Sequence, residues 1–267
     1  MKARRPPLDF TGLLADWAPD PGFATMLNAG GALAPAIEPY LNRVMSEAAR
    51  RLSDDKPALR PAPRPELRDE IRMLVRQETE HYRVHDAFNQ ALYAQGHDAL
   101  ALVGTDLKAA LNDQFRNRSF AFNLAYCVGF ETYTLYFGQF LFGPGARYFQ
   151  GADSRGVDLW LWHLAEEYEH RTVCHDAYTA LVGDYPLRVC VTLYVHRHMA
   201  GFRRRATAVL MATATPFERR RERGFAREMV ADMVPRVLPA FAPFYDPRRV
   251  LAAPGMAEAL DRYPEAA

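Results

Sequence analysis

The chain has 267 residues, of which 49% are hydrophobic and 24% are charged, and its formal net charge is +1. These values are ordinary for a globular protein, and the near-zero charge excludes an overall attraction to nucleic acid or acidic partners. Three cysteines without Cys-x-x-Cys spacing argue against a disulfide framework. The first residues, MKARRPPLDF, lack the apolar stretch of a secretory signal. We therefore expect a cytoplasmic protein that does not bind nucleic acid.

Helical spacing of apolar residues recurs along the chain, whereas no β-type alternation does, so the sequence predicts an all-α fold. Proline and glycine clusters mark the breaks between helices. In chain order, an irregular lead-in (1–25) is followed by a helix (35–52), a proline-rich linker (54–65) and a long helix (66–95). The next helix begins near 105, is interrupted at 116–119 and resumes to about 142. A helix capped by Asp153 or Ser154 ends near 183, and two helices (186–213 and 216–236) and a proline-rich tail complete the chain.

The segment 163–170, HLAEEYEH, contains the strongest functional signal. Residues three, four and seven apart lie on one face of a helix, so His163, Glu167 and His170 should converge beside it. The neighbouring Glu166 lies close to the same face and is a candidate further ligand or supporting residue, as is Asp176 downstream.

A second cluster lies upstream, where Glu78 and His81 repeat the Glu-x-x-His spacing and His85 follows one turn later. Two Glu-x-x-His elements on separate helices are the pattern of a dinuclear metal site inside a four-helix bundle, which takes one more Glu from each of the other two helices. Ordinary surface ion pairs are the alternative, but each cluster adjoins an apolar run, IRMLV or LWLW.

The two remaining carboxylates should come from the segment 119–146 and from the first predicted helix. Glu131 is the only charged residue of 119–146, and burial would penalise it heavily unless it is neutralised or coordinated. Polar residues interrupt that segment and no second span accompanies it, so we interpret it as a buried helix rather than a membrane span. In the first helix Glu38 is the best candidate, although Pro39 disfavours helical geometry there, because Glu47 lies in a more polar register.

Four carboxylates with two or three imidazoles and no thiolate favour iron or manganese over structural zinc. We expect two Fe ions, with Mn or a mixed Fe/Mn pair as the alternative. Aromatic side chains near Glu131 could form a substrate pocket, or they could be plain core: Phe122, Tyr126, Phe130 and Tyr133.

The stretches LVRQETEHYRVHDAFNQAL and LWLWHLAEEYEHRTVCHDAY, with FETYTL between them, resemble the ferritin-like family described as predicted metal-dependent hydrolases. The resemblance covers about residues 25–185, and an upstream F-P-x-G-E motif of the family is matched loosely by APAIE, which ends at Glu38. It implies a single helical domain over 1–267, with a ferritin-like four-helix bundle over 30–185 and accessory C-terminal helices and a tail over 186–267.

The spacing His163-x-x-x-Glu167-x-x-His170 is also similar to that of the di-iron arylamine N-oxygenases, in which a third His joins the usual ligands. That similarity implies that His163 is an additional ligand, a role that His85 could fill instead. It implies the following metal ligands: Glu38, Glu78, His81, Glu131, Glu167 and His170.

Three functions remain after these observations. We favour an oxygenase or oxidase that uses O2 as co-substrate to oxidise a small organic molecule, N-oxygenation included. The alternatives are a hydrolase with a dinuclear site and ferritin-like metal storage or oxidation. No glycine-rich nucleotide loop stands out, so electrons should come from an external donor, and the partners are otherwise a small-molecule substrate and a second copy of the chain. The basic runs Arg203–Arg205 and Arg219–Arg223 are interpreted as a solvated face.

Overall fold

The computed structural model describes residues 1–53 and 64–265, so most of the predicted linker at 54–65 lies outside the described residues. Within these ranges the chain is helical and has no strand, apart from an isolated bridge between Arg4 and Glu265. The all-α prediction is confirmed. The α-helices are α1 (Pro21–Gly31), α2 (Ala34–Ser53), α3 (Leu67–Leu92), α4 (Ala99–Asn117), α5 (Phe120–Phe142), α6 (Ser154–His170), α7 (Val173–Leu181), α8 (Tyr185–Leu210), α9 (Pro216–Val237) and α10 (Met256–Arg262). Short helical turns are Tyr93–His97, Pro144–Phe149, Leu238–Phe241 and Pro247–Arg249.

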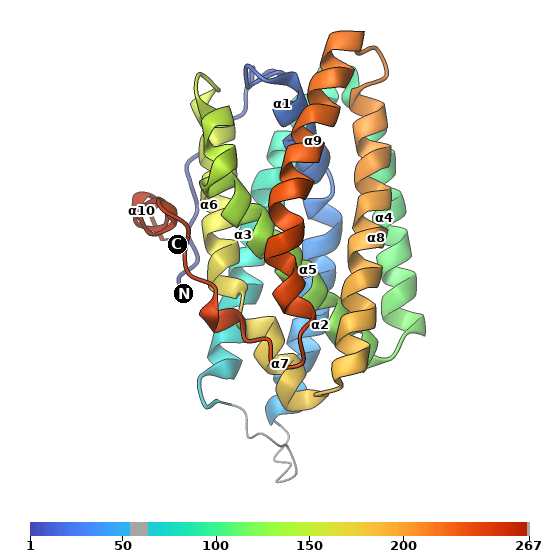
Figure 1. Ribbon diagram of the computed structural model, residues 1–267, viewed down its shortest axis with the longest axis vertical. Coiled ribbons are helices and arrows are strands. Elements are labelled where there is room, and N and C mark those ends of the chain that lie inside the picture. The colour runs from blue at the N-terminus through green and yellow to red at the C-terminus, as the bar shows by residue number, and fades with distance from the viewer. Residues whose placement is uncertain (54–63, 266–267) are drawn as a thin grey trace.

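The long helices run along the long axis of the molecule (Figure 1). Helix α2 packs along α3, and α5 packs against α6, which gives the four helices of the central bundle. Helix α8 packs on α5, while α9 packs on both α1 and α5. The arrangement is consistent with a ferritin-like bundle to which C-terminal helices are added.

Helix α5 is apolar on all sides because the surrounding helices enclose it. Every residue from 123 to 141 is buried except Tyr133. A Cβ added at Gly129 would lie 3.0 Å from the Cα of Thr192, so this glycine allows α8 to approach closely. Among the described residues, no helix is both long and apolar enough to cross a membrane.

Three predicted boundaries were wrong, one of which is the start of α4, at Ala99 instead of about 105. Helix α1 begins within the predicted irregular segment 1–25, because the side chain of Asp20 accepts a hydrogen bond from the Phe23 amide and caps a helix there. The helix that was expected to reach 183 ends instead at His170, and α7 begins after a two-residue turn. In that turn the Arg171 guanidinium donates to the carbonyl of Tyr168 at 2.7 Å and satisfies an oxygen near the helix end.

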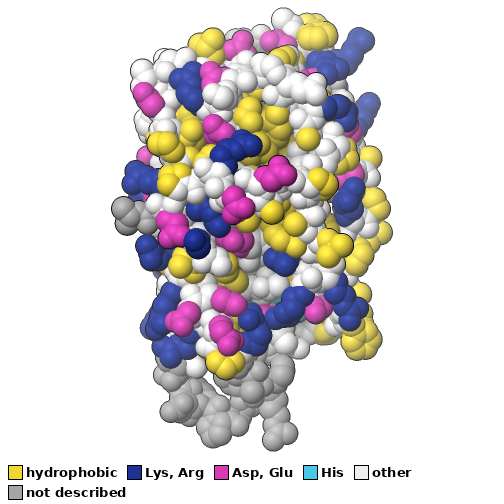
Figure 2. All heavy atoms as spheres, turned by 90° about the vertical axis from the view of Figure 1, so that its left-hand side faces the viewer, with side chains coloured by type: hydrophobic (Ala, Val, Ile, Leu, Met, Phe, Trp, Pro, Cys, Tyr) yellow, Lys and Arg dark blue, Asp and Glu magenta, His cyan; other side chains and the backbone are white. Residues whose placement is uncertain are grey.

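Figure 2 shows the side of the molecule that carries both chain ends. Basic and acidic side chains are interspersed over the described residues on this face, and apolar side chains occur between them in small groups. Residues 4–5 and 264–265 lie together there, since the Arg5 amide donates to the Pro264 carbonyl at 3.1 Å. The segment around Arg4 continues inward from this surface, because Arg4 itself is buried.

Candidate metal centre

The bundle brings all seven predicted ligands into two adjacent groups of buried side chains. Within each group, one potential ligand atom of every residue lies within 4.8 Å of the others. The groups are Glu38, His81 and His163, and Glu78, Glu131, Glu167 and His170. They draw on α2, α3, α5 and α6, so each helix of the central bundle contributes.

Two carboxylates of the second group, those of Glu78 and Glu167, also approach the first group. Glu78 has one oxygen 3.6 Å from Nδ1 of His81 and the other 3.3 Å from Nδ1 of His170. Glu167 spans the same two imidazoles, at 3.6 Å from His81 and 3.7 Å from His170. A carboxylate with one oxygen toward each group is suited to bridge two metal ions.

Among the described residues, most of the donor atoms that face the centre have no hydrogen-bond partner. Buried polar atoms are nearly always paired, so such a concentration requires an explanation. The unpaired atoms are Oε2 of Glu38, both carboxylate oxygens of Glu78 and Glu131, and Nδ1 of His81 and of His170. All of them belong to the predicted ligand set, and cations would satisfy them together. The residues present therefore fit a pair of metal ions.

The far nitrogen of each Glu-x-x-His imidazole is held by another side chain. Nε2 of His81 lies 3.0 Å from Oε2 of Glu166, and Nε2 of His170 lies 3.1 Å from Oε1 of Gln77. These contacts turn Nδ1 of both rings toward the centre, as outer partners of metal-binding histidines commonly do. Glu166, which the sequence offered as a ligand or a supporting residue, thus lies behind His81.

Residues near the start of the chain support this arrangement from outside. The amide and the guanidinium of Arg4 donate to Oε1 of Glu166 at 3.0 and 3.1 Å. The carbonyl of Lys2 accepts from the side-chain amide of Gln77 at 2.9 Å. Sequence reasoning missed Arg4 and Gln77, since neither belongs to a recognisable ligand pattern.

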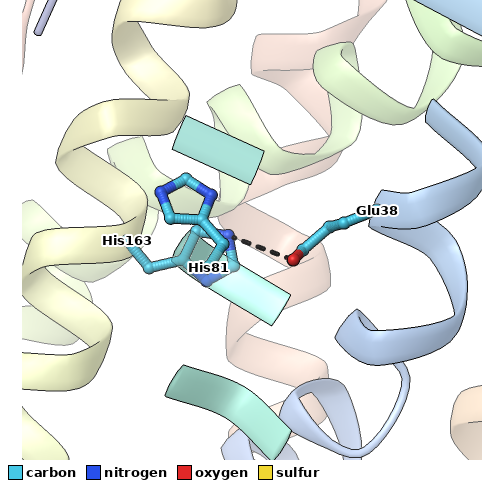
Figure 3. A group of neighbouring side chains, drawn as sticks. All are labelled: Glu38, His81 and His163. Atoms are coloured by element: carbon cyan, nitrogen blue, oxygen red, sulfur yellow. Dashed lines mark ion pairs between the residues drawn. The ribbon is translucent and has the colours of Figure 1, made fainter. Parts of the chain in front are cut away.

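His163 and His85 occupy different places. His163 points toward Glu38 (Figure 3), with its Nε2 3.7 Å from Oε1 of Glu38 and 2.9 Å from Oε1 of Glu167. Its Nδ1 lies 2.6 Å from Nε2 of His85, which sits behind it. Burial, together with the charges of His163 and His81, lowers the pKa of His85 well below its usual range. His85 is therefore neutral and suited to orient His163.

The pKa values of the carboxyl groups at the centre are shifted in opposite directions. Burial and the charge of Glu78 raise the pKa of Glu38 well above its usual range, and burial and Glu167 do the same to Glu131. Burial opposes ionisation of Glu167 too, but its close contacts with the imidazoles of His163 and His170 outweigh burial and lower its pKa. Metal binding must displace these protons, so metal affinity should rise with pH.

Asp176 is not brought to the centre. Its carboxylate forms ion pairs with Arg64, at 2.7 Å, and with Arg248. Burial acts to raise its pKa, but hydrogen bonds with His175 and the two arginines lower the pKa to about 2. The two arginines neutralise the charge of this carboxylate, so no metal ion is needed to stabilise it.

A cavity of about 90 Å³ opens onto the centre, and it contains two of the four predicted pocket aromatics. Phe130 and Tyr133 line it, together with Glu38, Thr134 and His163. Of the other two, Tyr126 is buried and contacts Nδ1 of His198 through its hydroxyl at 2.8 Å, and Phe122 packs on Tyr194. The hydroxyl of Thr134 donates to Oε2 of Glu167 at 2.8 Å, a contact that the sequence did not indicate.

Comparison with known proteins gives one match. A family model described as predicted metal-dependent hydrolase covers residues 2–250. Neither the curated proteins nor the solved structures contain a match to the chain, and the likeness to arylamine N-oxygenases stays a prediction. Because the family model spans nearly the whole sequence, the chain belongs to the family of predicted metal-dependent hydrolases.

Proposed function

We propose that the chain is a dinuclear metal enzyme whose ions lie between α2, α3, α5 and α6. The observation that carries this proposal is the set of buried, unpaired donor atoms converging on one region. The ligands are Glu38, Glu78, His81, Glu131, Glu167 and His170, with His163 as the additional one.

For the reaction we propose oxidation of a small organic molecule with O2. A pair of iron or manganese ions in a donor set of carboxylates and imidazoles supplies that chemistry when bound. Glu78 and Glu167 each approach both His81 and His170 and would hold the metal ions, and His85 orients His163. Apolar walls around the cavity exclude water, and Glu38 and His163 face the space that a substrate would fill.

Hydrolysis is the second candidate, and the family description favours it over the oxygenase. A dinuclear centre can activate water as well as O2. The ligand set supports the oxygenase instead, because all four helices contribute carboxylates in the pattern of dinuclear carboxylate proteins. The two candidates share the same ligands and differ in whether turnover needs oxygen.

Metal content tests the shared part of the proposal. Protein prepared with iron should contain about two metal ions per chain, because the ligands are too many for one ion. A preparation with a single zinc ion and full activity would contradict the dinuclear centre. Iron uptake far above two ions per chain would indicate storage.

Oxygen dependence tests the reaction. Reduced, iron-loaded protein should consume O2 and change its absorption spectrum, and substrate conversion should stop under argon. The same protein is then given esters, amides and phosphoesters under argon. Unchanged anaerobic turnover would overturn the oxygenase and support the hydrolase that the family description names.

A further inference from the structure

The cavity beside the centre is polar only at its two ends. At the inner end lie Glu38, Thr134 and His163. The wall between the ends is formed by apolar side chains from α1, α2, α5, α6 and α8, which include Ile37, Phe130, Phe137, Trp160, Val195 and Met199. Such a wall stabilises a bound hydrocarbon, and among the side chains just named only Trp160 carries a hydrogen-bonding group, its indole N–H.

The outer end carries one cation and two further polar groups. The guanidinium of Arg203 donates to the hydroxyl of Tyr133 at 3.3 Å. Nε2 of His196 is buried there without a hydrogen-bond partner. Burial lowers the pKa of His196, so this imidazole is neutral near pH 7. Across the described part of the chain, no carboxylate forms an ion pair with Arg203.

The surface outside this end is basic. Arg203 also lines a neighbouring surface groove, where Arg204, Arg219 and Arg223 accompany it and Glu222 is the one acidic lining residue. Clefts with walls of one charge sign attract ligands of the opposite sign. The cavity is thus approached through positive charge although the chain as a whole has a net charge of only +1.

We propose that the cavity binds a carboxylic acid with an apolar body, with its carboxylate on Arg203 and its apolar part extended toward Glu38 and His163. A guanidinium matches a carboxylate in shape and can donate two parallel hydrogen bonds to it. One cation beside a neutral imidazole suits a monoanion better than a phosphate dianion. That this acid is also the substrate rests on the proposed function, whereas its binding does not.

Binding of octanoate, octanol, octylamine and octyl phosphate to the metal-loaded protein tests this inference by calorimetry, without turnover. Octanoate should bind most tightly. Arg203→Gln should weaken octanoate binding about tenfold or more and leave octanol unchanged, because it removes a charge-assisted pair. The matched control is Arg197→Gln on the same helix, since Arg197 is exposed and does not line the cavity. It should bind octanoate like the wild type.

A second variant keeps the test decisive if Arg203→Gln does not fold. Ala200→Phe places a bulky ring in the cavity lining and should abolish binding of octanoate and octanol alike. Equal affinity of the wild type for octanoate and octanol, tighter binding of octyl phosphate, or an unchanged octanoate affinity in Arg203→Gln would each overturn the inference. Specific octanoate binding without O2-dependent conversion of any carboxylic acid would uphold the binding site and count against the proposed reaction.

Discussion

The guanidinium of Arg4 lies 3.1 Å from the carboxylate of Glu166, a residue 162 positions further along the chain. The other oxygen of Glu166 lies 3.0 Å from Nε2 of His81. Arg4, Glu166 and His81 therefore form a continuous chain of contacts from the surface segment to the metal centre. Because all three are buried, water cannot easily replace a missing member.

Arg4→Ala should weaken metal binding by about 10- to 100-fold, which is the usual cost of losing a partner that orients a ligand. Without Arg4, Glu166 keeps its charge in a buried position and no longer holds His81 firmly. Competition with a chromophoric chelator measures the affinity. Arg5→Ala is the control, because its side chain is 61% exposed and only approaches Glu80, at 3.5 Å. Equal affinities in the two variants would refute the role of Arg4.

Glu131→Ala should lose at least one metal ion and leave the metal-free protein no less stable than the wild type. The carboxylate is buried with both oxygens unpaired, so its removal relieves a cost that only a cation offsets. Elemental analysis and urea unfolding give the two readouts. Glu47→Ala should change neither by much, since among the described residues Glu47 pairs with Arg50 and Arg51 near the surface. Retention of both ions in Glu131→Ala would exclude it as a ligand.

His163→Ala should keep much of its metal, because the remaining ligands still surround the centre, but should lose substrate oxidation. His85→Ala should reproduce part of that loss, since it removes the side chain that contacts Nδ1 of His163 at 2.6 Å. Stopped-flow mixing of each reduced protein with O2 gives the spectral change and its lifetime. A His163→Ala protein with wild-type kinetics would show that this imidazole has no part in the reaction.

Asp176→Asn should destabilise the protein at neutral pH by roughly 2 kcal/mol, because each pKa unit corresponds to about 1.4 kcal/mol. The pKa of Asp176 is lowered from 3.8 to about 2 in the folded chain. A lowered pKa stabilises the fold above the unfolded pKa, and that contribution disappears as the pH falls from about 4 to 2. Urea unfolding should thus show the two proteins converging over this range. A gap that persists at pH 2 would mean that ionisation is not its cause.

The convergence of the proposed ligands could be predicted because helical periodicity fixes the relative directions of side chains within one element. The spacing of Glu78 with His81, and of Glu167 with His170, determines that each pair shares a face once the helix forms. Glu131 was identifiable because it is a lone carboxylate in an apolar helix. Glu38 occupies a corresponding place in α2 even though Pro39, the sixth residue of that helix, follows it and removes one backbone donor.

The supporting contacts could not be predicted, since they join residues that no local pattern relates. Nothing in the first five residues indicates that Arg4 reaches Glu166. Arg203 was interpreted as part of a solvated basic face, but the packing of α8 against α5 places it at the end of a cavity. The turn after His170 depends on a side-chain contact of Arg171, which spacing of apolar residues does not encode.

The segment that contains Lys2 and Arg4 contacts the two side chains that hold His81 and His170. Arg4 contacts Glu166, which holds His81, and Lys2 contacts Gln77, which holds His170. Residues 1–9 lie outside the helices, and such segments with few backbone hydrogen bonds open at a much lower free energy than the global unfolding of a domain. Release of residues 2–5 would loosen the rings of His81 and His170 together while the bundle stays folded. The residence time of the metal ions should therefore follow amide exchange in this segment, and strong denaturant would not be needed to extract them.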